Sequence, residues 1–242
     1  MIPKKIHYCW LSEEDMPANF LYNVESWRKN LLDYEFVKWD RKRFPLEKNI
    51  WVRQAFERKK YAFAADYIRL YALATEGGIY LDCDVEVLKS FNDLLHLPYF
   101  ICRENSPQGI EAAVMGAEKG IPWIMQSLDY YHGRKFVNED GVKQTVVLPS
   151  VLTHVISAHY RLSYVNGISE FEDSPECVSV LPCDFFCPKN YVTKKISITK
   201  NTYCIHHFAG SWQPAWKRLS LRLWLPFAAR YPRLAGRIKD YL

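Results

Sequence analysis

The sequence has no long hydrophobic run, and its main part has no excess of one charge. No uncharged apolar stretch approaches the roughly 20 residues that span a bilayer. We expect no cleavable signal sequence, because His7 and Glu13 interrupt the short apolar run near the start. The net charge is +5, but residues 214–242 hold seven basic and one acidic residue, so the remainder is near neutral. Proteins that track nucleic acid usually spread basic residues over their working face, so this distribution argues against that class.

Clustered cysteines and internal repeats are also missing. The seven cysteines are scattered, and Cys183 and Cys187 lack the second close pair of a zinc ribbon. We therefore expect reduced thiols in a cytoplasmic protein. Aromatic residues, by contrast, make up 15% of the chain. Most of them are expected in the core, although such side chains also line sites for sugars and nucleotides.

Alternating helix and strand signals predict an α/β sheet sandwich. Short apolar runs rich in aromatic and β-branched residues predict strands at 5–10, 34–39, 79–81, 99–102 and 178–181. Apolar residues at helical spacing predict helices at 19–31, in two stretches across 51–75, at 123–131 and at 148–159. No linker divides the chain, so we expect one domain over 1–213 and a basic, aromatic appendage over 214–242.

Two carboxylates, Asp82 and Asp84, directly follow the apolar strand at 79–81, which itself follows a helix and the Gly77-Gly78 turn. Ligands in open α/β sheets bind outside the carboxyl ends of strands. Carboxylates at that position suit Mn²⁺ or Mg²⁺, whose other ligands are commonly phosphate oxygens and water. Taken alone, the pattern also fits a solvated strand end at which the acids face water or pair with Lys89.

Three ordered motifs make the chain resemble glycosyltransferase family 32. They are I-P-K-K-I-H-Y-C-W at 2–10, Y-A-F-A-A-D-Y-I-R-L-Y-A-L followed by G-G-I-Y-L-D-C-D within 61–84, and H-H-F-A-G-S-W at 206–212. That family includes bacterial capsular and O-antigen polysaccharide transferases and yeast initiating mannosyltransferases, and it is similar to the catalytic domain of large clostridial glucosylating toxins. The resemblance covers about residues 1–95 and 203–212. It implies a GT-A fold, a single Rossmann-like nucleotide-sugar-binding domain with a mixed central sheet. The charge pattern adds a basic C-terminal helical appendage to this fold.

The resemblance also implies a metal site. Asp84 is expected to be the firmer ligand, while Asp82 could reach ribose or sugar hydroxyls as well as the ion. His207 is the best candidate for a third ligand, with His206 close behind. Because neighbouring side chains of an extended strand point to opposite faces, only one of the two histidines is expected to reach the site.

Contacts to the donor are expected from a second group of residues. The resemblance implies that Asp66 accepts hydrogen bonds from donor hydroxyls, that Arg69 contacts the sugar or phosphate, and that Trp10 stacks on uracil. The alternatives are an exposed ion pair for the first two and a core position for the third. Three residues would close over the diphosphate: Gly210, Ser211 and Trp212. Three others could line the sugar or acceptor pocket: Glu104, Asn105 and Gln108.

These features predict a metal-dependent glycosyltransferase that moves a hexose, with galactose or glucose favoured, from a UDP-sugar to a glycan acceptor. The resemblance implies retention at the anomeric carbon and a role in bacterial surface polysaccharide synthesis. Interleaved Trp and Arg in 214–242 are typical of a membrane interface, so we expect a lipid-linked acceptor and a place on the inner face of the cytoplasmic membrane. One alternative is a haloacid-dehalogenase-like phosphohydrolase, although Glu86 stands where that class has Thr or Val. Another is a catalytically silent nucleotide-sugar or glycan-binding protein.

Overall fold

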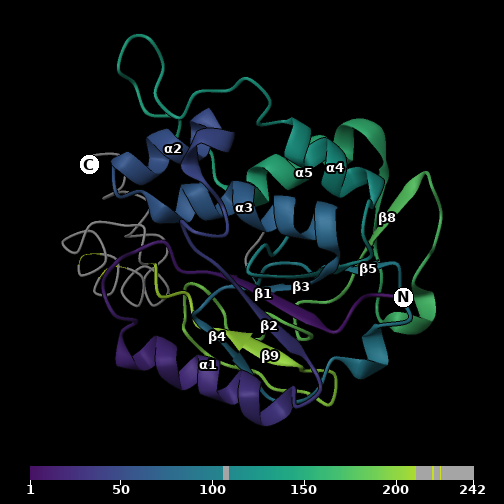
Figure 1. Cartoon of the computed structure of the whole chain (residues 1–242). Helices are drawn as coiled ribbons and strands as arrows, with labels where there is room; N and C mark the ends of the chain where they lie inside the picture. The colour runs from purple at the N-terminus through teal and green to yellow at the C-terminus, as the bar shows by residue number, and fades with distance from the viewer. Residues whose placement is uncertain (106–108, 211–219, 221–223, 225–242) are drawn as a thin grey trace.

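A five-stranded mixed sheet forms the centre of the computed structural model, which describes residues 1–105, 109–210, 220 and 224 (Figure 1). The strand order is β2-β1-β3-β6-β5. The strands are β1 (Lys5–Cys9), β2 (Glu35–Trp39), β3 (Gly78–Leu81), β5 (Tyr99–Phe100) and β6 (Val114–Ala117). β1 pairs in parallel with β2 and β3, whereas β6 pairs antiparallel with β3 and β5. The predicted mixed sheet is confirmed, with β2 at its edge.

Helices cover both faces of this sheet. Figure 1 shows α2, α3, α4 and α5 on one side, and α1 with the β4–β9 pair on the other. Their bounds are α1 (Ala18–Asn30), α2 (Ile50–Glu57), α3 (Tyr61–Glu76), α4 (Pro122–Asp129) and α5 (Leu148–His159). Short 3-10 helices lie at Leu46–Lys48, Asn92–Leu94 and Ile168–Glu170. No helix among the described residues is long and apolar enough to cross a bilayer.

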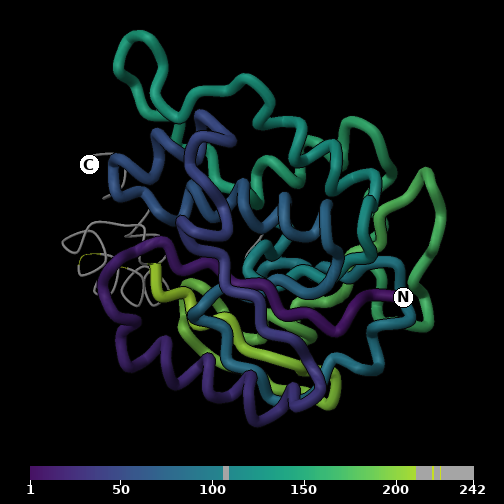
Figure 2. Tube along the Cα trace, in the orientation of Figure 1, coloured from purple at the N-terminus to yellow at the C-terminus, as the bar shows by residue number. Residues whose placement is uncertain are grey.

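Two small strand pairs complete the fold. β4 (Val85–Val87) pairs antiparallel with β9 (Cys204–His206), and β7 (Arg161–Tyr164) pairs in parallel with β8 (Cys177–Val180). Figure 2 shows the late segment that includes β9 returning beside β4, although more than a hundred residues separate them. This return brings the third sequence motif next to the acidic pair.

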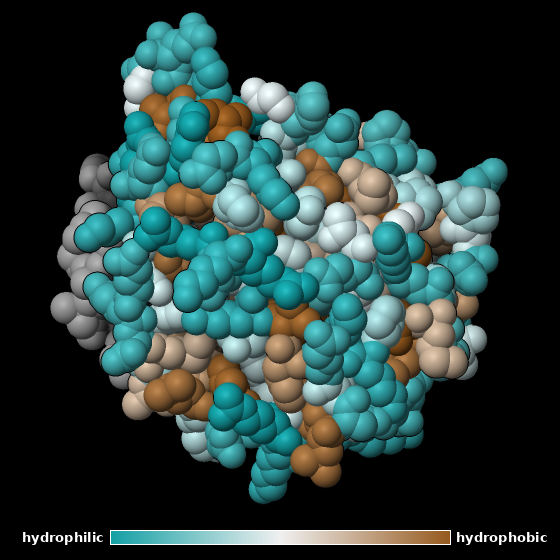
Figure 3. All heavy atoms as spheres, in the orientation of Figure 1, coloured by the Kyte–Doolittle hydropathy of each residue, from teal (hydrophilic) through white to brown (hydrophobic). Residues whose placement is uncertain are grey.

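The side chains of β3 contribute to a hydrophobic cluster on each face of the sheet. Tyr80 packs in the cluster under α2 to α5, while Ile79 and Leu81 pack in the cluster on the α1 side. This alternation follows from the two-residue period of a strand. The face of the molecule shown in Figure 3 is mostly hydrophilic with scattered apolar side chains, as is usual for a globular protein.

A glycine turn connects α3 to β3 and so determines where the strand ends and the acidic pair begins. Gly77 ends the helix with φ of 66°, and a Cβ there would lie 2.8 Å from the backbone nitrogen of Lys119. Glycine satisfies both constraints because it has no Cβ and tolerates positive φ. The predicted helix end and turn are confirmed.

Several of the predictions concern residues outside those described. They are the pocket role of Gln108, the closing roles of Ser211 and Trp212, and the domain boundary and appendage at 214–242, of which only Ser220 and Trp224 are described.

Candidate active site

α3 places a buried ion pair beneath the end of β3. Asp66 and Arg69 lie one helical turn apart and are 8% and 5% exposed, so the alternative of an exposed pair is wrong. The Arg69 guanidinium lies 3.2 Å from Asp66 Oδ1 and 3.1 Å from Asp82 Oδ1. It also donates to the carbonyl oxygen of Ala112 at 2.6 Å. One guanidinium therefore fixes two carboxylates from different elements.

One hydrogen-bond donor of Arg69 is unpaired within the described part of the chain. Its Nε is buried and has no hydrogen-bond partner among the described residues, and the guanidinium lies 4.6 Å from the centroid of the Tyr80 ring. Buried donors are nearly always paired, so an unpaired one is often explained by a ligand, ion or water that completes the site.

Asp82 leaves β3 at the carboxyl end of the sheet. Its backbone N–H donates to Ala113 O at 2.9 Å, and its Oδ1 accepts from the Tyr80 hydroxyl at 3.0 Å. Burial raises the pKa of Asp82, Arg69 opposes this rise, and the charge of Asp84 adds to it. The Arg69 guanidinium and the Tyr80 hydroxyl therefore hold this carboxylate in one orientation.

Asp84 lies between the end of β3 and the segment that follows β9. Its Oδ2 accepts from the Ala209 N–H at 2.8 Å, and its carbonyl oxygen accepts from the His207 N–H at 2.9 Å. The β4–β9 register pairs Val85 with His206, so the His206 ring lies directly beside Asp84. His206 Nε2 is 3.4 Å from Asp84 Oδ2.

The ligand atoms of Asp82, Asp84 and His206 all lie within 4.8 Å of one another. Glu111, which the sequence reasoning missed, lies behind the histidine with Oε2 3.1 Å from His206 Nδ1. The only signal that could have identified it is a single carboxylate within the otherwise apolar run at 110–115. Glu111 is 3% exposed.

The Asp84 and Glu111 carboxylates lie on either side of the His206 ring, so this cluster favours a positive charge between them. Burial by itself raises the pKa of Asp84 and Glu111, but His206 brings each of them down to about 2. Burial lowers the pKa of His206, yet the Glu111 and Asp84 carboxylates raise it well above its usual value. Two carboxylates and an imidazole form a ligand set that suits Mn²⁺ or Mg²⁺, so the residues present fit a divalent cation.

The order predicted for the two histidines is corrected by this geometry. His207 Nε2 lies 2.9 Å from Glu86 Oε2 and so engages a different carboxylate, outside the cluster of His206 with Asp82 and Asp84. Of the two neighbouring rings, the one whose Nε2 lies beside the aspartates is His206.

Trp10 follows β1 at the same edge of the sheet. It is half-buried, its Nε1 donates to Glu14 O at 2.9 Å, and its ring meets Phe20 edge-on at 5.9 Å. Cys83, between the two aspartates, donates to the carbonyl oxygen of Cys9 at 3.4 Å. The ends of β1 and β3 are therefore adjacent, and Trp10 lies at the same edge of the sheet as the acidic pair.

Two more polar side chains lie near this edge. Lys189, which the sequence reasoning missed, donates from Nζ to His207 O at 2.9 Å, and burial lowers its pKa while Asp84 raises it. Asn105 donates to Pro188 O at 3.3 Å, so its amide holds the neighbouring loop. Gly210 has φ of 61°, which is compatible with the turn predicted there.

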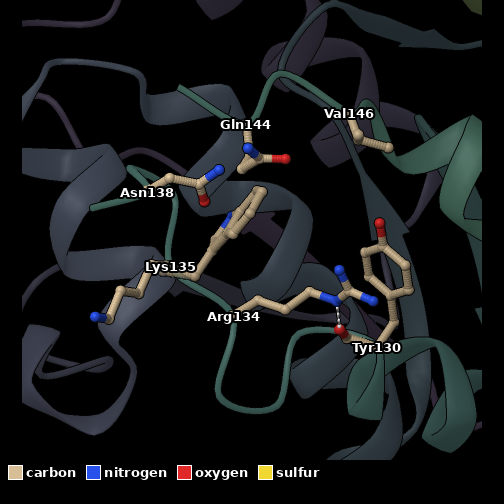
Figure 4. A pocket seen from close by; sticks show the side chains of 7 residues that line it. Tyr130, Arg134, Lys135, Asn138, Gln144 and Val146 are labelled. Atoms are coloured by element: carbon tan, nitrogen blue, oxygen red, sulfur yellow. Dashed lines mark hydrogen bonds between the residues drawn. The ribbon is translucent and has the colours of Figure 1, made fainter. Parts of the chain in front are cut away.

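A surface pocket of about 270 Å³ lies elsewhere, between α2 and the loop after α4 (Figure 4). Trp51 and Tyr130 form part of its wall, and Arg134 lies across the Tyr130 ring at 4.0 Å. None of the described residues that line it belongs to the acidic cluster. The pocket is therefore separate from the candidate metal ligands.

Comparison with solved structures shows the class of fold. The chain aligns with mouse xyloside xylosyltransferase 1 in its apo form at a TM-score of 0.50 and 13% identity, over 87% of this chain and 99% of that one. Together with the mixed central sheet and the acidic pair at its carboxyl edge, this likeness identifies the GT-A fold of glycosyltransferases.

Comparison of sequences assigns one region of the chain to a described family. Residues 17–101 match the family described as glycosyltransferase sugar-binding region containing DXD motif. The chain is 35% identical over 129 residues to inositol phosphoceramide mannosyltransferase 3 of Schizosaccharomyces pombe, covering 52% of this chain and 36% of that protein. It is 31% identical over 132 residues to mannosyl phosphorylinositol ceramide synthase SUR1 of Saccharomyces cerevisiae, covering 53% and 34%. The matches thus span about a third of the length of these relatives.

Proposed function

We propose that this chain is a metal-dependent glycosyltransferase that moves a hexose from a nucleotide sugar to a glycan or glycolipid acceptor. The observation that carries the proposal is the convergence of Asp82, Asp84 and His206 ligand atoms within 4.8 Å. This cluster stands at the carboxyl end of β3, where its two aspartates form the DXD sequence of the matched region.

In this proposal Asp82, Asp84 and His206 hold Mn²⁺ or Mg²⁺. The bound ion supplies positive charge that stabilises the nucleoside diphosphate as its bond to the sugar breaks. Lys189, half-buried and within electrostatic reach of Asp84, adds a second cation to the same side. Preorganised charges of this kind are effective because they need no reorganisation during the reaction.

The α3 pair serves the sugar. Burial raises the pKa of Asp66 to about 6, so above neutral pH its carboxylate accepts hydrogen bonds from donor hydroxyls. Arg69 fixes the orientation of this carboxylate relative to Asp82 through contacts of 3.2 and 3.1 Å. The half-buried indole of Trp10 supports stacking on the base of the donor. We also propose that the transfer retains the configuration at the anomeric carbon, as the family resemblance implies.

The donor and the acceptor are proposed by class. We favour UDP-galactose or UDP-glucose as the donor, and because one relative above is named a mannosyltransferase, GDP-mannose stands beside them as a candidate. The relatives' names also include an inositol phosphoceramide, which supports a lipid-linked acceptor. A bacterial surface polysaccharide precursor is another member of that class.

Membrane contact through residues 214–242, on the cytoplasmic face, is proposed from their sequence of interleaved aromatic and basic residues. Sedimentation with anionic liposomes tests it, because the full chain should bind and a chain ending at residue 213 should not. Equal binding by both would refute this part of the proposal.

The experiment for the whole proposal is a donor screen. The protein is incubated with UDP-glucose, UDP-galactose or GDP-mannose and MnCl₂, and release of the nucleoside diphosphate is measured. Release should occur with one donor, should stop on addition of EDTA, and should be lost in Asp84→Asn. Phosphate release from phosphomonoesters would instead indicate a hydrolase. Donor binding without any release would indicate a silent binding protein.

A further inference from the structure

Glu111 is a buried carboxylate in an apolar environment. It precedes β6, is 3% exposed, and its own N–H donates to Cys102 O at 2.8 Å. A carboxylate is costly to bury unless it is paired, and both of its oxygens are engaged here. Oε1 accepts from the Ala113 N–H at 2.7 Å, and Oε2 lies 3.1 Å from His206 Nδ1. The position of the Glu111 carboxylate relative to the histidine is therefore fixed.

These contacts determine how the His206 ring is presented. With Nδ1 donating to Glu111, the other nitrogen, Nε2, faces Asp84 Oδ2 at 3.4 Å. The Phe208 ring, at 4.1 Å between centroids, packs against the imidazole and restricts its rotation. Histidines that bind metals usually donate their second ring N–H to such a partner, which sets both tautomer and orientation.

We infer that Glu111 is a positioning residue, which holds the proton of His206 on Nδ1 so that Nε2 is offered to a divalent cation shared with Asp82 and Asp84. The inference rests on the proposed function, because it concerns the metal site of that proposal. Glu111 does not belong to the group formed by Asp82, Asp84 and His206; it contacts His206 Nδ1 and so acts through the histidine.

The neighbouring backbone makes a second role possible, and an experiment must separate the two. Ala112 O accepts from Arg69 at 2.6 Å, and Ala113 O accepts from the Asp82 N–H at 2.9 Å. A change at Glu111 could therefore disturb the site by shifting this segment. A purely structural role would lower stability without a selective effect on metal binding.

The chain contains a matched control in the adjacent histidine. Glu86 Oε2 lies 2.9 Å from His207 Nε2, so this pair has the same chemistry at the next residue. His207 does not belong to the cluster formed with Asp82 and Asp84. Glu86→Gln thus removes an equivalent carboxylate without affecting the ring that faces the aspartates.

The experiment compares Mn²⁺ affinity in the wild type, Glu111→Gln and Glu86→Gln, measured from the electron paramagnetic resonance signal of free Mn²⁺. Thermal unfolding in EDTA shows whether each variant is folded. We expect Glu111→Gln to bind Mn²⁺ about 10- to 100-fold more weakly, the usual effect of losing such a partner. Glu86→Gln should keep the wild-type affinity. Unchanged affinity in folded Glu111→Gln, or an equal loss in both variants, would overturn the inference.

A measurement on the unaltered chain covers the case in which Glu111→Gln does not fold. The ¹⁵N shifts of the His206 ring, assigned by comparison with His206→Asn, are recorded with Mg²⁺ bound. A protonated Nδ1 and an unprotonated Nε2 are expected, and the opposite tautomer would refute the positioning role.

Mn²⁺ binding by the wild type distinguishes a failure of the proposed metal site from a failure of the role of Glu111. Failure of the wild type to bind Mn²⁺ would overturn the proposed metal site and the role of Glu111 together. Binding that is lost in Asp84→Asn but retained in Glu111→Gln would overturn only the role of Glu111.

Discussion

The buried carboxyl of Asp66 makes the stability of this fold depend on pH in a defined direction. Burial raises its pKa from an ordinary value of 3.8 to about 6, and Arg69 limits the rise. Between about pH 4 and pH 6 the folded chain therefore binds more protons at this site than the unfolded chain. The free energy of unfolding that Asp66 contributes consequently falls as pH rises through this window. A gap of about two pKa units corresponds to about 3 kcal/mol.

Asp66→Asn removes the titrating group while keeping its size and an acceptor for Arg69. Urea unfolding in EDTA at about pH 4 and pH 7.5 gives the free energy of unfolding of the variant and of the wild type. Taking the difference between the two at each pH removes the contribution of groups that titrate alike in both proteins. We expect this difference to shift by up to ~3 kcal/mol in favour of the variant at the higher pH. The exposed Asp15→Asn should show no such shift. Parallel pH profiles for Asp66→Asn and the wild type would show that the Asp66 carboxyl does not take up its proton in this window.

Two further predictions concern the packing around the site. Arg69→Met leaves the buried Asp66 and the half-buried Asp82 without their cation and should cost about 3 kcal/mol at pH 7.5. The cost should be smaller near pH 5, where Asp66 takes up a proton, and an equal loss at both pH values in urea unfolding would contradict this. Gly116→Ala places a Cβ 2.3 Å from the Phe100 ring and should destabilise the chain by about 1–3 kcal/mol. Gly167→Ala, with nothing within 4 Å, should not, and equal urea midpoints for the two variants would be the contrary result.

Much of the fold follows from local patterns that a single segment carries. The apolar spacing of α3, the Gly77-Gly78 turn and the short apolar β3 lie next to one another, so their order alone places Asp82 at a strand end. By contrast, β6 was not predicted. It is the four-residue run V-M-G-A, in which Gly116 weakens the strand signal. The reason for this glycine is the Phe100 ring on the neighbouring strand, which leaves no room for a Cβ, and the local sequence does not reveal that contact.

The details of the site depend on contacts between distant segments. Whether His206 or His207 faces the aspartates is decided by the β4–β9 register, which pairs Val85 with His206. Both strands are only three residues long, too short for a clear alternating pattern. Glu111 lies 95 residues from the histidine it contacts, and nothing in its local sequence indicates that partner. The sequence therefore predicted the acidic pair and its location, but not the residues that contact and orient His206.

Mn²⁺ affinity in His206→Asn and His207→Asn, determined side by side with the wild type, distinguishes the two histidines. We propose that His206 completes a cation site with Asp82 and Asp84, while His207 is engaged with Glu86. We predict that His206→Asn loses Mn²⁺ binding and that His207→Asn retains it. Retained binding in His206→Asn with loss in His207→Asn would show that His206 does not complete the site.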